Sequence, residues 1–176
     1  SPESQISARV WDWREGVRID AEFFAGRLRR AIARREHLLE PGPTQAARLV
    51  HGEADGLPGL VVDRFGDTLV VQIATAGMER VKNEIIAALD KVLKPQAILL
   101  RNDSGIRELE GLPSEVVVAH GEPPEFVELT ENGVRFRAPL HTGQKTGWFY
   151  DQRPNRAWLH DVANGRSVLD VFSYIG

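Results

Sequence analysis

Residues 60–74 read LVVDRFGDTLVVQIA and decide the fold of the first half of the chain. Two apolar runs rich in β-branched residues, at 60–65 and 68–74, flank Gly66 and Asp67, a pair typical of tight turns. This pattern predicts two antiparallel strands joined as a β-hairpin. It therefore places a sheet at the centre of this part of the protein.

Further elements are expected around this hairpin and complete a compact unit. In chain order they are a strand at 47–51, a glycine-rich turn at 52–59, a helix at 78–93, a strand at 96–101, a short helix near 105–110 and a strand at 114–119. The long helix follows from apolar residues at helical spacing, which are Val81, Ile85, Ala88, Leu89 and Val92. Because these residues share one face, we expect the helix to pack on the sheet. The fold class of residues 46–119 is therefore predicted to be α+β, in the order β-β-α-β-β.

The N-terminal part of the chain predicts a linker and a basic helix. Residues 6–13 alternate apolar and polar side chains, as in a short strand or an extended linker. Asp20 is a good helix cap, and a helix is expected from there to about His37. Five of the nine residues at 27–35 are arginines, and three of these share one helical face: Arg27, Arg30 and Arg34. Two interpretations stay open, a solvated face of an amphipathic helix or a patch that contacts phosphate.

The second half of the chain predicts another hairpin and the beginning of a different domain. Asn132 and Gly133 separate alternating runs at 126–130 and 134–138, which is a strong hairpin signal. Three further elements are expected after it: a polar loop at 141–147, a helix at 149–162 with Pro154 near its first turn, and a strand at 167–172. A proline- and glycine-rich break at 40–43 marks the earlier boundary, before the first strand.

Composition excludes several classes of function. The chain has no cysteine, which excludes disulfides, thiolate metal sites and a cysteine nucleophile within it. Its five histidines show no metal-ligand spacing, so no metal site is predicted. No apolar run approaches the roughly 18 residues of a membrane helix, so no membrane partner is expected. The net charge is −3, so any nucleic-acid binding must come from a local patch.

The last predicted strand is a weak indication of a cofactor site. In doubly wound α/β proteins, a nucleotide cofactor lies at the carboxyl end of an apolar strand, next to a glycine-containing turn. The strand at 167–172 carries Asp170 and is followed by Gly176. Many core strands share this pattern, so the residues need support from other parts of the chain.

Three stretches supply that support, because together they resemble the ribosomal RNA large subunit methyltransferase I family. They are HGEADGLPGLVVDR at 51–64, GQKTGWFYDQR at 143–153 and VLDVFSYIG at 168–176. Their order and spacing match the family from about Ile6 to the end of the chain. The first two stretches are long, which makes the resemblance specific.

The resemblance implies a protein of three parts: an N-terminal RNA-binding PUA domain, a central α+β domain and a Rossmann-like methyltransferase domain. The implied division of this chain is a linker strand and basic helix at 1–40, the central domain at 41–123, a connecting β-hairpin at 124–142 and the first helix and strand of the truncated methyltransferase domain at 143–176. The implied cofactor is S-adenosylmethionine. The implied reaction is methylation of C5 of a cytosine in 23S ribosomal RNA, in the cytoplasm.

The resemblance also implies which residues bind the cofactor. They are Lys145, Thr146, Phe149, Asp151, Gln152, Arg153, Asp170, Phe172, Ser173 and Gly176. The predicted RNA contacts are Arg27, Arg30 and Arg34. Methylation of cytosine C5 requires a nucleophile at C6, normally a cysteine thiolate. The family's cysteine and its acidic-proline loop come later in the family's chains, so no catalytic residue is assigned here.

Two other functions stay open from the sequence. A near relative could methylate guanine N7, which needs no cysteine, or the chain could be a non-catalytic RNA-binding module. The chain starts at Ser1 and stops at Gly176, directly after an apolar run, so we expect a fragment that does not bind S-adenosylmethionine tightly. The strand at 167–172 should then be covered by the helix around Trp158, or by a second copy in a homodimer.

Overall fold

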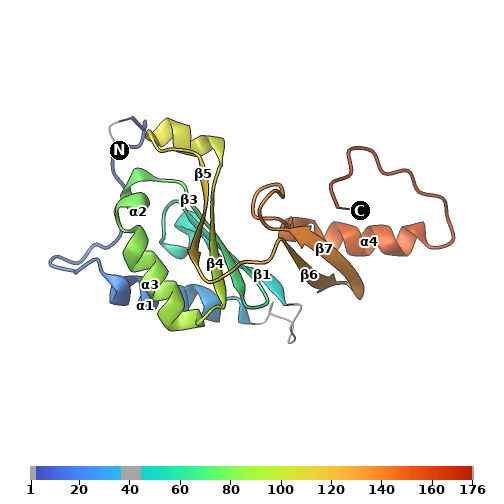
Figure 1. Ribbon diagram of the computed structural model, residues 1–176, viewed down its shortest axis with the longest axis horizontal. Coiled ribbons are helices and arrows are strands. Elements are labelled where there is room, and N and C mark those ends of the chain that lie inside the picture. Colours follow the sequence, from blue (N-terminus) through green and yellow to red (C-terminus); the bar gives the residue numbers. More distant parts are fainter. Residues whose placement is uncertain (1–2, 37–44, 176) are drawn as a thin grey trace.

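A five-stranded mixed sheet forms the centre of the protein, and a two-stranded sheet lies beside it (Figure 1). The computed structural model describes residues 3–36 and 45–175. The strands are β1 (Ala46–His51), β2 (Leu60–Phe65), β3 (Thr68–Ile73), β4 (Ala97–Asn102), β5 (Glu115–His120), β6 (Phe126–Glu131) and β7 (Val134–Pro139). The helices are α1 (Ala21–Ala33), α2 (Ala76–Arg80), α3 (Lys82–Leu93) and α4 (Arg153–Ala163), with 3₁₀ turns at Gly52–Asp55, Gly105–Glu110 and Tyr150–Gln152.

The central sheet has one more strand than the predicted β-β-α-β-β order. Its spatial order is β1-β2-β3-β4-β5, antiparallel except for the parallel pair β3 and β4, which α2 and α3 connect. The strand that this order leaves out is β1, which was itself expected at 47–51. The turn at 52–59 reverses the chain and sets β1 against β2. This turn needs glycine: Gly59 has a φ of +78°, and a Cβ there would lie 2.4 Å from Thr75 Cγ2.

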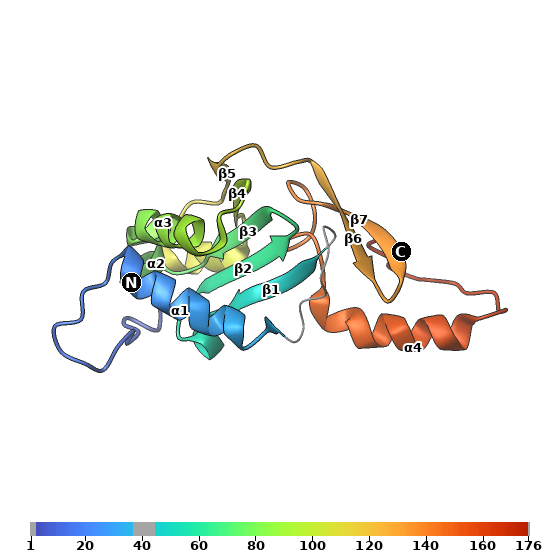
Figure 2. The same cartoon turned by 90° about the horizontal axis from the view of Figure 1, so that it is seen from below.

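Helices α1 and α3 lie side by side and cover one face of the central sheet (Figure 2). Asp20 caps α1 by accepting hydrogen bonds from the Glu22 and Phe23 amides, as its sequence position predicts. The predicted packing of the long helix is confirmed, because Ile85, Ala88 and Leu89 are fully buried against the sheet.

Two helix boundaries differ from the prediction. The helix expected over 78–93 is divided into α2 and α3 at Val81, whose φ of −112° and ψ of 25° are not helical. The basic helix ends at Ala33, and Arg34 is its C-cap. His37 and the predicted break at 40–43 lie outside the described residues. Residues 6–13 form no strand and run as an irregular segment.

The β6–β7 hairpin lies on the other face of the central sheet (Figure 1). Its turn is the predicted one, and Asn132 and Gly133 both have positive φ, 52° and 77°. A second apolar cluster joins the hairpin to the sheet and is formed by Phe65, Val70, Leu99, Leu129, Ala138, Leu140 and Trp148. Successive side chains of β3 and β4 point to opposite faces of the sheet, so these strands contribute to both apolar clusters. Val70 and Leu99 face the hairpin, while their neighbours in each strand face the helices.

The strand predicted at 167–172 is wrong for this structure. These residues form no strand, and Leu169 and Phe172 are 86% and 100% exposed. A strand needs a hydrogen-bonding neighbour, and none of the described strands lies beside this segment. The helix around Trp158 does not cover it either, because Trp158 is itself exposed and α4 projects away from the central sheet (Figure 2).

The packing of α3 predicts how two leucines differ in their contribution to stability. Leu89→Ala removes a fully buried side chain from the cluster between α3 and the sheet, and should lower the free energy of unfolding by about 2–5 kcal/mol. Leu159→Ala on the exposed α4 makes the same chemical change and should cost far less. Urea denaturation followed by circular dichroism measures both, and equal losses would contradict this packing.

Candidate functional site

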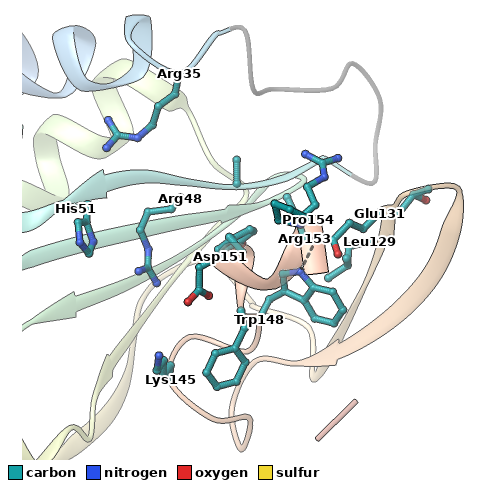
Figure 3. Close-up of a pocket in the computed structure, with 15 residues that line it drawn as sticks. Arg35, Arg48, His51, Leu129, Glu131, Lys145, Trp148, Asp151, Arg153 and Pro154 are labelled. Carbon is teal, nitrogen blue, oxygen red and sulfur yellow. Dashed lines mark hydrogen bonds between the residues drawn. The ribbon is translucent and has the colours of Figure 1, made fainter. Parts of the chain in front are cut away.

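A cavity lies between β1 and the segment 145–154, with a volume of about 680 Å³ (Figure 3). We call it the β1 cavity. Its charged and titratable lining residues are Arg35, Arg48, His51, Glu131, Lys145, Asp151 and Arg153. Its aromatic lining residues are Trp148, Phe149 and Tyr150. The cavity is thus walled by the central sheet on one side and by the polar segment that follows the hairpin on the other.

A fully buried carboxylate fixes the segment to the sheet beneath this cavity. Asp63 of β2 lies opposite Arg48 of β1 and accepts hydrogen bonds from its Nε and Nη2 at 2.8 and 2.9 Å. Those bonds raise the pKa of Arg48. The hydroxyl of Thr146, also fully buried, donates to the same carboxylate. One carboxylate therefore holds β1, β2 and the 145–154 segment together.

Arg101 of β4 is a second connection between the sheet and this segment. Its guanidinium is nearly fully buried and donates to the carbonyl oxygens of Leu140 at 2.6 Å and Gly143 at 2.7 Å. Asp103 accepts from the same guanidinium at 2.9 Å, which balances its charge. The approach requires glycine at 143, because a Cβ there would lie 2.3 Å from the Pro139 carbonyl oxygen.

Glu131, at the end of β6, connects the hairpin to α4. It accepts hydrogen bonds from Trp148 Nε1 at 3.1 Å and from Arg156 Nε at 2.5 Å, and the Arg156 guanidinium lies over the Trp148 ring. Tyr150 packs beside Phe65, and its burial raises the pKa of its hydroxyl well above the usual value. The aromatic wall of the β1 cavity is therefore fixed by polar contacts at its edges.

Four of the predicted cofactor residues line the same cavity in the structure. Lys145, Phe149, Asp151 and Arg153 all line the β1 cavity, and the Lys145 ammonium lies 4.5 Å from the centre of the Phe149 ring. Lys145 and Asp151 bear opposite charges, and Figure 3 shows both near the guanidinium of Arg48.

The other six predicted cofactor residues lie elsewhere. Thr146 is directed at Asp63, and Gln152 accepts a hydrogen bond from Asn155 at the start of α4. Asp170, Phe172 and Ser173 lie on the exposed C-terminal segment, and Gly176 lies outside the described residues. That segment is held near the cavity by Tyr174, whose hydroxyl accepts from the Gln144 amide and whose ring contacts Phe149.

Sequence reasoning missed Arg48, His51 and Asp63. The pair Arg48 and Asp63 could have been predicted, because Asp63 is a carboxylate inside the apolar run 60–65. A buried carboxylate needs a cation or several donors, and β1 offers Arg48 at the opposing position. His51 gave no comparable signal, because its place at the cavity depends on the turn that follows it.

The predicted RNA contacts divide into one partly buried and two exposed arginines. Arg27 donates to the carbonyl oxygens of Trp11 and Gly56, and burial together with the nearby Arg30 charge lowers its pKa. Arg30 and Arg34 are exposed. All three line a second cavity of about 430 Å³, at the end of α1, which we call the arginine pocket.

Neither a metal site nor a membrane span is found in the part of the chain that the structure describes. No group of three or more histidine or acidic side chains is arranged to hold a metal ion among residues 3–36 and 45–175. Within the same ranges, no helix has the length and apolar character to cross a membrane.

The chain matches known methyltransferases along its whole length. Residues 112–176 match the family model of S-adenosylmethionine-dependent methyltransferases. The whole chain aligns with ribosomal RNA large subunit methyltransferase I of Erwinia tasmaniensis at 42% identity, and with that of Alteromonas mediterranea at 38%. It spans 45% and 44% of those two proteins. The resemblance found in the three sequence stretches is thereby confirmed.

Two solved structures share the fold. One, from Streptococcus mutans and assigned as a SAM-dependent methyltransferase, superposes with a TM-score of 0.68 at 23% identity, over 82% of this chain and 37% of its own. Another, assigned as a methyltransferase and complexed with SAH, superposes with a TM-score of 0.68 at 24% identity, over 82% of this chain and 36% of its own. These likenesses support the mixed sheet with its helices.

The buried hydroxyl of Thr146 yields a prediction with a matched control. Thr146→Val keeps the shape of the side chain but removes the donor to Asp63, and should cost about 1–3 kcal/mol of stability. Thr146→Ser retains the hydroxyl and should cost less. Hydrogen exchange of the amides at 145–149 should accelerate in the valine variant only. Equal exchange in both variants would show that this hydrogen bond does not hold the segment.

Proposed function

Since this chain belongs to the ribosomal RNA large subunit methyltransferase I family, we propose that a protein of its relatives' length containing it methylates large-subunit ribosomal RNA. S-adenosylmethionine is the methyl donor of the family whose model matches residues 112–176. The observation that supports the proposal most strongly is the β1 cavity, which Lys145, Asp151 and Arg153 line beside an aromatic wall. The RNA substrate would place the protein in the cytoplasm.

The residues of the β1 cavity fit the amino-acid end of the cofactor by their chemistry. That end carries a carboxylate and an ammonium group, and the bound cofactor supplies a methyl group from its sulfonium. Lys145 would hold the carboxylate and Asp151 would hold the ammonium, while Arg153 adds positive charge on the opposite side of the cavity (Figure 3). Arg48 is a less suitable partner, because Asp63 already accepts two of its hydrogen bonds. The Phe149 ring would give an apolar surface beside these charges.

Thr146 and Gln152 contribute to this site indirectly. We assign Thr146 to positioning, because its hydrogen bond to Asp63 fixes the backbone that carries Lys145. Gln152 lies at the start of α4 and bonds to Asn155 there. Asp170, Phe172, Ser173 and Gly176 would complete the methionine end once the segment that carries them pairs as a strand. The domain boundaries at 41–123, 124–142 and 143–176 and the homodimer stay predictions.

The proposed target is C5 of a cytosine in 23S ribosomal RNA. This reaction needs a thiolate that adds to C6 of the base before methyl transfer. The chain contains no cysteine, so none of its residues is proposed as the nucleophile. Its contributions would be to hold the cofactor in the β1 cavity and to bind RNA through the basic face of α1, which carries Arg27, Arg30 and Arg34.

Isotopically labelled S-adenosylmethionine tests the reaction. A protein of the relatives' length that includes this chain, incubated with unmodified 23S ribosomal RNA, should yield labelled 5-methylcytidine by mass spectrometry of the digested nucleosides. Asp151→Asn should raise KM for the cofactor at least about tenfold, because it removes the charge opposite the ammonium. Asp161→Asn on the exposed side of α4 is the matched control and should be neutral.

The products of that experiment separate the alternatives. Labelled 7-methylguanosine would contradict the cytosine assignment and favour the guanine N7 reaction. RNA binding without any labelled nucleoside would favour a non-catalytic module. An Asp151→Asn variant with an unchanged KM would show that the β1 cavity does not hold the cofactor.

The 176-residue chain alone should bind S-adenosylmethionine weakly. The residues that would form the pocket are divided between the β1 cavity and the exposed segment that carries Asp170, Phe172 and Ser173. Calorimetric titration should therefore show no micromolar binding. A micromolar dissociation constant would show that the β1 cavity is a more complete site than its lining suggests.

A further inference from the structure

The arginine pocket holds more positive charge than its acidic residues balance. Four arginines line it, with two aspartates, Asp12 and Asp55, although the chain as a whole has a net charge of −3. Two of the arginines, Arg30 and Arg34, lie one turn apart on α1, and a third, Arg14, belongs to the segment that precedes the helix. Such a local excess of guanidinium groups in an acidic chain is typical of an anion site.

Asp12 fixes Arg14 at the pocket and leaves it able to bind an anion. The carboxylate accepts from Arg14 Nε at 3.1 Å and from Nη2 at 3.0 Å, and these hydrogen bonds hold the pKa of Asp12 well below its usual value. Only two of the five N–H donors of the Arg14 guanidinium are used in this pair. Its side chain is 77% exposed, so the remaining donors are open to a ligand.

The third predicted contact, Arg27, has a structural role. It holds the segment before α1 to the turn at 52–59 through the carbonyl oxygens of Trp11 and Gly56. Burial and the charge of Arg30 lower the pKa of Arg27, so these two cations repel each other. An anion bound at Arg30 would relieve that repulsion without any movement of Arg27.

An ion-pair network links the lining of the arginine pocket to that of the β1 cavity. Asp55 pairs with Arg34 at 3.7 Å and with Arg35 at 2.8 Å. Arg34 lines the arginine pocket, whereas Arg35 lines the β1 cavity together with His51. Figure 3 shows Arg35 at the end of α1, on the same side of the cavity as His51 and Arg48. A row of cationic side chains thus leads from one cavity to the other.

We propose that the arginine pocket binds the backbone phosphates of a single RNA strand through Arg14, Arg30 and Arg34, and directs that strand toward the β1 cavity. The proposal rests on the proposed function for the identity of the substrate as RNA. Arginine forks suit phosphate oxygens, and contacts to the backbone position a strand independently of its sequence. Arg14 is thereby added to the RNA-binding residues, and Arg27 is moved from contact to support.

Fluorescence anisotropy with a labelled single-stranded RNA, measured at several salt concentrations on the 176-residue chain, tests this. Arg14→Gln combined with Arg30→Gln and Arg34→Gln should weaken binding at least about tenfold. The slope of log Kd against log salt should become shallower by about 2, since three phosphate contacts on a single strand are lost. Arg14→Gln alone should weaken binding and should produce about one third of that change in slope.

Arg29→Gln is the matched control. Arg29 is exposed on the same helix, but lies about 100–140° around the helix axis from Arg30 and Arg34 and outside the pocket. It should leave both affinity and slope nearly unchanged. Circular dichroism of each variant shows that it is folded, and Arg27→Gln, which removes two structural hydrogen bonds, should instead lower the melting temperature.

The outcomes separate this proposal from the proposed function. If the triple variant binds RNA as the unchanged chain does, or if Arg29→Gln loses as much, the arginine pocket is not the phosphate site. If the unchanged chain binds no RNA even at low salt, the pocket proposal also fails. In each case the labelled-nucleoside experiment still decides independently whether the protein is a ribosomal RNA methyltransferase.

Discussion

The Asp63 carboxylate is the contact on which the rest of the arrangement depends. A carboxylate without exposure to water is costly unless cations and donors surround it, and here Arg48 and Thr146 both do so. These partners come from β1 and from the segment after the hairpin, so satisfying one charge fixes three pieces of chain. Thr146 is buried at this contact, and the nearby residues Lys145 and Phe149 of the same segment line the β1 cavity.

Two further charged side chains, Arg101 and Glu131, also connect parts of the chain through hydrogen bonds made away from water. Arg101 and Glu131 are each nearly buried, and each bonds to groups from the segment between the hairpin and α4. Polar groups buried in this way have few alternative partners, so they specify one geometry more strongly than apolar contacts do. The C-terminal segment has no such connection before Tyr174, and its apolar side chains are exposed. The structure therefore combines a fixed cavity wall with an unpaired segment next to it.

Local patterns in the sequence predicted most of the fold. The hairpins at Gly66 and at Asn132 and the packed helix after residue 81 rest on short-range spacing that the structure retains. The break at Val81 and the coil at 167–172 were not predictable in this way, because they depend on which neighbours are present. The stretch 141–147 was predicted as a polar loop, yet Thr146 within it is buried, and its partner Asp63 is too distant in the sequence for local patterns to reveal the contact. Arg27 was missed as a structural residue for the same reason.

The central claim is that the β1 cavity holds the amino-acid end of the cofactor, and chemical-shift mapping tests it most directly. Titrating ¹⁵N-labelled chain with S-adenosylhomocysteine at high concentration reports even weak binding, residue by residue. The account predicts shifts concentrated at the amides of Lys145, Phe149, Asp151 and Arg153, with smaller changes along β1. Shifts confined to residues 168–173, with the β1 cavity unperturbed, would contradict it.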